Sequence, residues 1–193
     1  MEKGTDHSGI GRNSSLCTDV HVRKYMKDRD YSHFYQQLTG RIRESGAACF
    51  LLRTAGKAAT GIMYAAYPIL LARLAVEGAC RDLLFSVLIP GAGFILLTLV
   101  RAKINRPRPY ETWDIRPLIH KDTKGNSMPS RHVFSSAVIA MAWLPVYPPA
   151  GVLFLILTAA AALIRVLGGV HYPSDVTVGF LTGILAGIPL LLL

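Results

Sequence analysis

Long apolar segments without charge alternate with short polar links along most of the chain. Three stretches contain no Asp, Glu, Lys or Arg: Leu83 to Val100, Val133 to Ile164 and Val176 to Leu193. A helix that crosses a bilayer needs about 17 to 25 mainly apolar residues. The pattern therefore predicts an all-α fold, a multi-pass bundle of transmembrane helices.

Prolines set one boundary within this bundle. Pro145, Pro148 and Pro149 predict a tight turn, because proline lacks a backbone N–H and disfavours helical backbone before it. The segments on either side then form a helical hairpin. About five spanning helices are expected on this basis. Their ranges are Ala58 to Val76, Leu83 to Val100, Val133 to Tyr147, Ala150 to Gly168 and Val176 to Leu193.

The N-terminal part has a different pattern. Residues 1–30 are rich in Gly, Ser, Asp and Lys without apolar periodicity, which predicts a flexible polar tail. Tyr31 to Lys57 mixes apolar residues with four basic ones, which favours an amphipathic helix at the membrane surface and leaves a sixth span as the alternative. The basic residues are Arg41, Arg43, Arg53 and Lys57. Residues 31–193 are expected to form a single membrane domain.

The order of the spans predicts which loops share a side of the membrane. The loop from Arg101 to Arg131 follows the second span, and the hairpin then leaves and returns, so the loop from Gly168 to Asp175 emerges on the same side. Five spans place the N-terminus on that side too, whereas six spans place it on the opposite side. The polar residues of both loops should therefore gather at one face.

Composition narrows the possible functions. The net charge of +9 is compatible with nucleic acid, an anionic membrane or an anionic substrate. No zinc-finger or RNA-recognition signature is present, so no nucleic-acid partner is expected. The cysteines Cys17, Cys49 and Cys80 are odd in number and widely spaced, which argues against a disulfide framework or a zinc site. The polar N-terminus lacks the apolar core of a cleavable secretory signal.

Three polar clusters on the shared face contain groups suited to phosphoryl chemistry. The guanidinium of arginine binds phosphate oxygens through paired, charge-assisted hydrogen bonds. A neutral imidazole can attack phosphorus, and a protonated one can give its proton to the leaving oxygen. Asp175, four residues after His171, can orient that ring. The clusters are Arg101, Arg106 and Arg108; Ser130, Arg131 and His132; and Arg165, His171 and Asp175.

The spacing of these residues resembles the type-2 phosphatidic acid phosphatase, or lipid phosphate phosphatase, superfamily, and specifically its short bacterial members. The family pattern is K-x6-R-P, then P-S-G-H, then S-R-x5-H-x3-D. The corresponding residues here are Arg101 and Arg108-Pro109, then Pro129-Ser130-Arg131-His132, then Ile164-Arg165, His171 and Asp175. Three positions depart from the pattern: Arg101 replaces Lys, Arg131 replaces Gly and Ile164 replaces Ser.

The resemblance implies a role for each matching residue. His171 would form a phosphohistidine, Asp175 would orient it and His132 would protonate the leaving group. Arg101, Arg108, Ser130 and Arg165 would bind phosphate oxygens, and Arg131 could add a contact. The resemblance also implies a mechanism without metal or other cofactor, and no carboxylate cluster for magnesium is apparent in the sequence.

These residues predict a hydrolase of the cell membrane that acts on a phosphorylated lipid, with its active site at the external face. Family resemblance offers phosphatidic acid, phosphatidylglycerol phosphate and undecaprenyl diphosphate as substrates. Two alternatives remain open: a lipid phosphotransferase of the same superfamily, and a non-catalytic lipid-binding or scaffold protein. Some polar residues are expected to contact lipid headgroups or the membrane interface rather than take part in catalysis. They are Arg106, Arg116, Lys121, Lys124, Tyr110 and Trp113.

Overall fold

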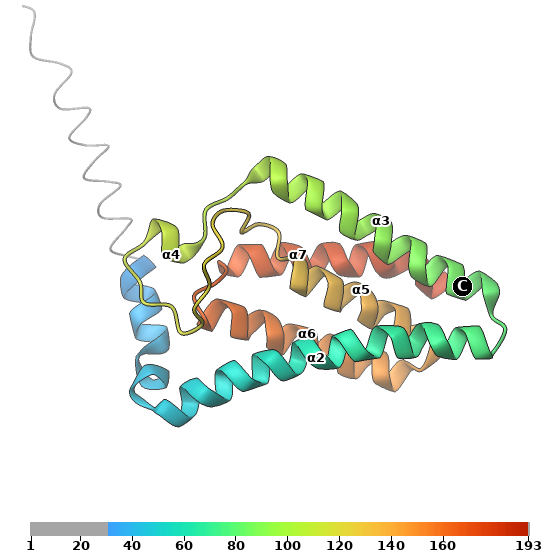
Figure 1. The fold of residues 1–193 in the computed structure, drawn as a ribbon, viewed down its shortest axis with the longest axis horizontal. Coiled ribbons are helices and arrows are strands. Elements are labelled where there is room, and N and C mark those ends of the chain that lie inside the picture. The colour runs from blue at the N-terminus through green and yellow to red at the C-terminus, as the bar shows by residue number, and fades with distance from the viewer. Residues whose placement is uncertain (1–30, 193) are drawn as a thin grey trace, which may run out of the picture.

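The computed structural model describes residues 31–192, which form a bundle of helices without any strand (Figure 1). The predicted all-α fold is confirmed. The expected polar tail, residues 1–30, lies outside the described residues. The elements are a helix over residues 31–44, α2 (Gly46–Val76), α3 (Cys80–Ile104), α4 (Pro109–Thr112), α5 (Arg131–Val146), α6 (Pro148–Leu167), α7 (Pro173–Gly187) and the 3-10 helix η1 (Ile188–Leu192).

Four helices in the described part of the chain are long and apolar enough to cross a membrane. They contain α2, α3, α6 and α7, the last continued by η1. Their outward faces carry exposed apolar side chains, among them Leu96 and Leu99 of α3, each 63% exposed. Such a surface is typical of contact with lipid. The remaining predicted span, α5, has 16 residues and is shorter.

α5 occupies the centre of the bundle and contacts α2, α3, α6 and α7. Its side chains Phe134, Ala137 and Val138 are at most 2% exposed. Gly183 of α7 allows a close approach, because a Cβ there would lie 2.6 Å from the Cβ of Ala137. Small residues of this kind let helix backbones pack tightly inside a membrane.

The predicted hairpin is confirmed, since Tyr147 ends α5 and caps the start of α6. The predicted amphipathic helix from Tyr31 to Lys57 is wrong in its second half. The chain is extended at Ser45, whose Oγ accepts a hydrogen bond from the backbone N–H of Ala48 at 3.2 Å. This N-cap separates helix 31–44 from α2, so residues 46–57 lengthen the first spanning helix, which was expected to begin at Ala58.

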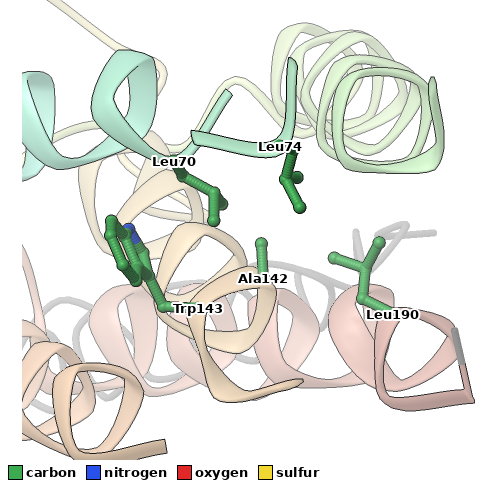
Figure 2. Packing of buried hydrophobic residues seen from close by; sticks show 5 residues of the cluster. All are labelled: Leu70, Leu74, Ala142, Trp143 and Leu190. Carbon is green, nitrogen blue, oxygen red and sulfur yellow. The ribbon is translucent and has the colours of Figure 1, made fainter. Parts of the chain in front are cut away.

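The two ends of the bundle differ. The α2–α3 turn lies at the end on the right of Figure 1, where Leu70, Leu74, Ala142, Trp143 and Leu190 pack together (Figure 2). The long loop between α4 and α5 and the α6–α7 loop meet at the other end. There, the N–H of Ile119 donates to the carbonyl of Gly168 at 3.1 Å. As predicted, the two loops share one face.

Candidate active site

Five helices, α3 to α7, and the α6–α7 loop bring the predicted site residues to this looped end. Arg101 lies in the last turn of α3, and Arg108 directly precedes α4. Ser130 caps α5, and His132 lies in its first turn. The remaining predicted residues are Arg131 at the start of α5, Arg165 in the last turn of α6, His171 in the α6–α7 loop and Asp175 in the first turn of α7.

Two glycines allow these elements to meet. Gly169 has a φ of +73°, a conformation that favours glycine, and it turns the chain from α6 toward His171. Gly179 of α7 faces Ser130, where a Cβ would lie 2.7 Å from the Ser130 carbonyl oxygen. This contact leaves room for the N–H of Ser130 to donate to the carbonyl of Asp175 at 3.0 Å. The start of α5 is thereby joined to the start of α7.

Two of the predicted arginines are buried and hold the loops together. Arg101 is 6% exposed, and its Nη1 donates to the carbonyl of Pro129 at 2.9 Å. Arg108 is 3% exposed and donates to the carbonyls of Gly125 at 3.2 Å and Val170 at 3.4 Å. Each guanidinium has five N–H donors, so these bonds leave others available to an anion.

His171 lies beside a serine as well as beside the predicted aspartate. Its Nδ1 is 3.4 Å from Ser127 Oγ and 3.6 Å from Asp175 Oδ2. Ser127 Oγ also donates to Asp175 Oδ2, which in addition accepts the N–H of Tyr172 at 3.0 Å. The serine hydroxyl thus connects the ring to the carboxylate. With a proton on Nδ1 facing this pair, the lone pair of Nε2 is free.

Arg106 is bonded directly to the predicted orienting carboxylate. Its Nη1 donates to Asp175 Oδ1 and to Ser174 Oγ, both at 2.8 Å. Its guanidinium also stacks on the ring of Tyr172, 4.1 Å from the centroid. The prediction that Arg106 serves only at the membrane surface is therefore wrong. The Arg-Pro-Arg-Pro run was the signal for it, but nothing in the sequence paired it with Asp175.

An aromatic group covers this ion pair. Trp113 Nε1 donates to the hydroxyl of Tyr172 at 2.8 Å. Tyr31, from helix 31–44, packs on both rings, with centroid distances of 5.1 Å to Trp113 and 5.3 Å to Tyr172. Burial is the main cause that raises the pKa of Tyr31 to about 12. Trp113, which was expected at the membrane interface, therefore also packs against Tyr172 and Tyr31 next to the site.

The surroundings of His171 favour its neutral form. The residue is 1% exposed, and this burial lowers its pKa from 6.5 to about 4. The nearby Asp175 carboxylate opposes that shift, whereas Arg108 and Arg101 add to it. The imidazole is therefore unprotonated near pH 7, as a nucleophile must be.

The same region has unused capacity to bind an anion. Ser130 Oγ is the single buried side-chain polar atom without a hydrogen-bond partner among the described residues. Within residues 31–192, neither Arg101, Arg108 nor Arg165 forms a salt bridge with a carboxylate. Buried polar groups and charges usually have partners, so these groups together are suited to several oxygens of one anion.

His132 and Arg165 lie at the edge of a cavity of about 300 Å³ that extends between α2, α3, α5 and α6. Arg165 Nη2 donates to Thr60 Oγ1 at 3.5 Å. Arg165 lines this cavity together with His132, and His171 lies near His132. The lining of the cavity is mainly apolar and includes Met63 and Ile139.

Arg131 lies on the cavity side of the site. Its side chain is exposed, and its Cζ lies 5.9 Å from the centroid of the Phe94 ring. It lines the cavity together with His132 and Arg165, and its charge acts on Arg101. Arg131 therefore lies next to His132 and not among the contacts of His171.

Lys121 was expected at the membrane surface, yet it is half-buried among the site cations. Burial and the neighbouring charges of Arg108, Arg165, Arg101 and Arg131 lower its pKa to about 8. No motif or spacing in the sequence marks this lysine. Its position depends on how the long loop folds back over α6, which only the three-dimensional structure reveals.

Ile164, the position where the family pattern has serine, contacts α2. A Cβ on Gly56 would lie 3.1 Å from Ile164 Cγ2. Compared with the serine of the family pattern, isoleucine lacks a hydroxyl group but adds an apolar contact between α6 and α2. Among residues 31–192, no group of three or more His, Cys, Asp or Glu side chains could hold a metal ion.

Comparison with known proteins identifies the family of this chain. The sequence model of the PAP2 superfamily matches residues 79–193, a range that contains every predicted site residue. The crystal structure of Aquifex aeolicus LpxE is similar, with a TM-score of 0.66 and 20% identity over 83% of this chain and 94% of LpxE. The PAP2-type phosphatidylglycerolphosphate phosphatase of Bacillus subtilis gives a TM-score of 0.49 and 23% identity, over 88% of this chain and 92% of that one. A search of curated proteins gave no match. Since the matched range exceeds half of the chain, this protein belongs to the PAP2 superfamily.

Proposed function

We propose that this protein is a lipid phosphatase that works through a phosphohistidine at His171. The observation that carries the proposal is a buried, neutral imidazole near Arg101 and Arg108, neither of which forms a salt bridge with a carboxylate within residues 31–192. A phosphoryl group supplies the missing negative charge and offers phosphorus to the ring. Membership in the PAP2 superfamily supports the same reaction class.

Each residue has a defined task in the proposed mechanism. Nε2 of His171 attacks phosphorus while Ser127 and Asp175 hold the proton on Nδ1. Arg101, Arg108, Ser130 and Arg165 stabilise the charge on the equatorial oxygens. His132 gives a proton to the departing oxygen and then takes one from the water that hydrolyses the phosphohistidine. No step uses a metal ion.

The proposed substrate is a lipid, because the cavity beside His132 connects the charged cluster to the apolar interior of the bundle. A phosphorylated headgroup would bind the arginines while part of the hydrocarbon chain lies along Met63 and Ile139. Residues 31–193 would act as a single domain in this process.

Phosphate release by the purified protein tests the proposal. Wild-type protein in detergent micelles should release inorganic phosphate from a phosphorylated lipid, and His171→Gln should release none. Brief reaction with a lipid labelled in its terminal phosphate should give protein-bound label that survives base and is lost in acid, as a phosphohistidine is. Activity retained by His171→Gln would reject the assigned nucleophile, and label found on an added alcohol instead of in solution would identify a transferase.

We further propose that the site faces the outside of the cell membrane. Asn126 lies in the loop beside the site, so a cysteine at this position reports the side on which the loop is exposed. Replacing Cys17, Cys49 and Cys80 first removes the natural thiols. A membrane-impermeant maleimide should label Asn126→Cys in intact cells, and labelling only after lysis would place the site inside.

A further inference from the structure

The loop before α5 is attached to the link between α3 and α4 through three consecutive backbone N–H groups, those of residues 125–127. The N–H of Gly125 donates to both carboxylate oxygens of Glu111, at 2.7 and 3.0 Å. The next N–H donates to the side-chain oxygen of Asn105 at 3.3 Å, and the third donates to the carbonyl of Arg106 at 2.8 Å. The position of segment 125–127 thus depends on residues 105–111.

The backbone of this segment has an unfavourable conformation. Gly125 and Asn126 have φ values of +61° and +50°, in the left-handed region that side chains rarely adopt. Gly125 also lies so close to Asn105 that a Cβ would be 2.5 Å from the side-chain oxygen of that asparagine. Such a conformation persists only where surrounding contacts hold it. The hydrogen bonds from residues 105–111 are the contacts that do so here.

The segment ends at the serine of the proposed active site. Ser127 is completely buried, and its Oγ lies 3.4 Å from His171 Nδ1 and donates to Asp175 Oδ2. A hydroxyl that faces two partners at once needs a fixed backbone beneath it. Since Gly125 lies two residues before this serine, the Glu111 carboxylate acts on the hydroxyl through the main chain.

Glu111 also connects the segment to Arg108. Its Oε2 accepts the N–H of Arg108 at 3.0 Å, while Arg108 Nε donates to the carbonyl of Gly125 at 3.2 Å. Both polar groups of the Gly125 backbone are therefore bonded to this pair of residues. The Glu111 side chain is exposed and lies outside the three sequence motifs, and its bonds go to backbone N–H groups. Any effect on the reaction must act through other residues.

We propose that Glu111, assisted by Asn105, is a positioning residue for the reaction at His171. The inference rests on the proposed phosphatase function and adds two residues that no motif marks. Glu111 fixes segment 125–127, so that the Ser127 hydroxyl keeps the proton of His171 on Nδ1 and leaves Nε2 free to attack phosphorus. Hydrogen bonds that orient a reacting group in this way raise the rate without touching the substrate.

A double-mutant cycle with Ser127→Ala tests this inference. Glu111→Ala should lower kcat about tenfold, the effect of losing a hydrogen bond to a charged group, with KM within about twofold of the wild-type value. In the Ser127→Ala protein the same change should lower kcat by less than about threefold, because the hydroxyl is already absent. Glu111→Gln keeps one acceptor and should recover part of the rate. Asp114→Asn, an exposed acidic residue of the same loop, is the matched control and should leave kcat unchanged.

Asn105→Gly probes the second contact. Asn105 has a φ of +40°, which glycine also adopts, so this change removes the amide without straining the backbone. We expect kcat to fall about threefold, less than for Glu111→Ala, because the lost hydrogen bond is neutral. Asn105→Asp keeps an acceptor and should restore the rate.

Hydrogen–deuterium exchange in detergent micelles gives a second readout that needs no activity. The N–H groups of residues 125–127 should exchange about tenfold faster in Glu111→Ala than in wild-type protein, whereas those of α5 should keep their rate. Unchanged exchange of residues 125–127 would overturn the inference. Equal losses of kcat with and without the Ser127 hydroxyl would also overturn it.

Two further outcomes separate the positioning role from the alternatives. A higher KM with unchanged kcat would mean that Glu111 acts on phosphate binding through Arg108, and the proposed role would be rejected while the phosphatase function stands. If wild-type protein releases no phosphate, or if His171→Gln remains active, the proposed function fails and the catalytic part of this inference fails with it. The exchange measurement then still shows whether Glu111 holds segment 125–127.

Discussion

At the end where α2 turns into α3, the helices meet through apolar side chains, whereas at the opposite end they meet through hydrogen bonds of charged groups. Leu70, Leu74 and Leu190 pack around Ala142 and Trp143 in the first region. In the second, Asp175 alone accepts bonds from Arg106, Ser127 and Tyr172. The contrast separates two tasks: apolar packing tolerates small changes, whereas the polar network fixes the position of individual atoms.

Asp175→Asn should give the largest effect. The amide is nearly the same size, but it carries no charge for Arg106 and can favour the wrong tautomer of His171. We expect kcat to fall by about ten-thousandfold, in line with the same change in other triads. Steady-state phosphate release measures this, and KM should change little. A kcat equal to that of the wild type would show that the polar network does not orient the ring.

Leu70→Ala should affect the opposite property. Leu70 is fully buried in the apolar cluster, so its truncation leaves a cavity that costs about 3 kcal/mol. Thermal unfolding in detergent should show a lower Tm, while kcat per folded molecule stays at the wild-type value. If kcat per folded molecule also fell, packing at the apolar end would affect the geometry of the polar end.

Acidification should weaken the polar end selectively. The pKa of His171 is about 4 in the folded protein and about 6.5 when exposed, so the unfolded chain binds the proton more tightly. Stability from this group is complete above pH 6.5 and falls as the pH drops toward 4. Between pH 7.5 and pH 5 the loss should be about 2 kcal/mol.

The control for this prediction is His171→Gln, which has no proton to bind at this position. Its Tm should decrease less than that of the wild type over the same pH range. Equal decreases in the two proteins would assign the pH dependence to other groups.

Ser127→Ala should give the smallest of the four effects. Asp175 remains close to His171 without the hydroxyl, so part of the orientation persists. We expect kcat to fall about tenfold, which corresponds to one hydrogen bond to a charged group. Ser127→Thr keeps the hydroxyl and should recover activity. If threonine does not restore turnover while the protein remains folded, the hydroxyl is not the relevant group.

The sequence predicted the bundle and the grouping of the loops because both depend on the length and order of apolar segments. It also predicted His171 with Asp175, because only three residues separate them in the chain. It could not identify Ser127, because a serine in a loop has no periodicity to mark it. The contact between Arg106 and Asp175 joins residues 69 positions apart and depends on the packing of α3 against α7.

The sequence pattern also did not predict where the amphipathic helix ends. Apolar and basic residues lie on both sides of Glu44, Ser45 and Gly46, so composition alone favoured one helix. A single side-chain cap divides it, and only the capped geometry separates helix 31–44 from α2.

The packing of Tyr31 on Trp113 and Tyr172 limits the access of water to the Arg106–Asp175 pair. Helix 31–44 precedes residues 79–193, the range that matches the superfamily model. Its Tyr31 nevertheless packs on Trp113 and Tyr172, and so covers the Arg106–Asp175 pair. A fragment limited to the shared range would keep every motif but open this pair to solvent, where an exposed ion pair contributes little. The proposed catalytic residues and the residues that shield them from water thus come from separate parts of the chain.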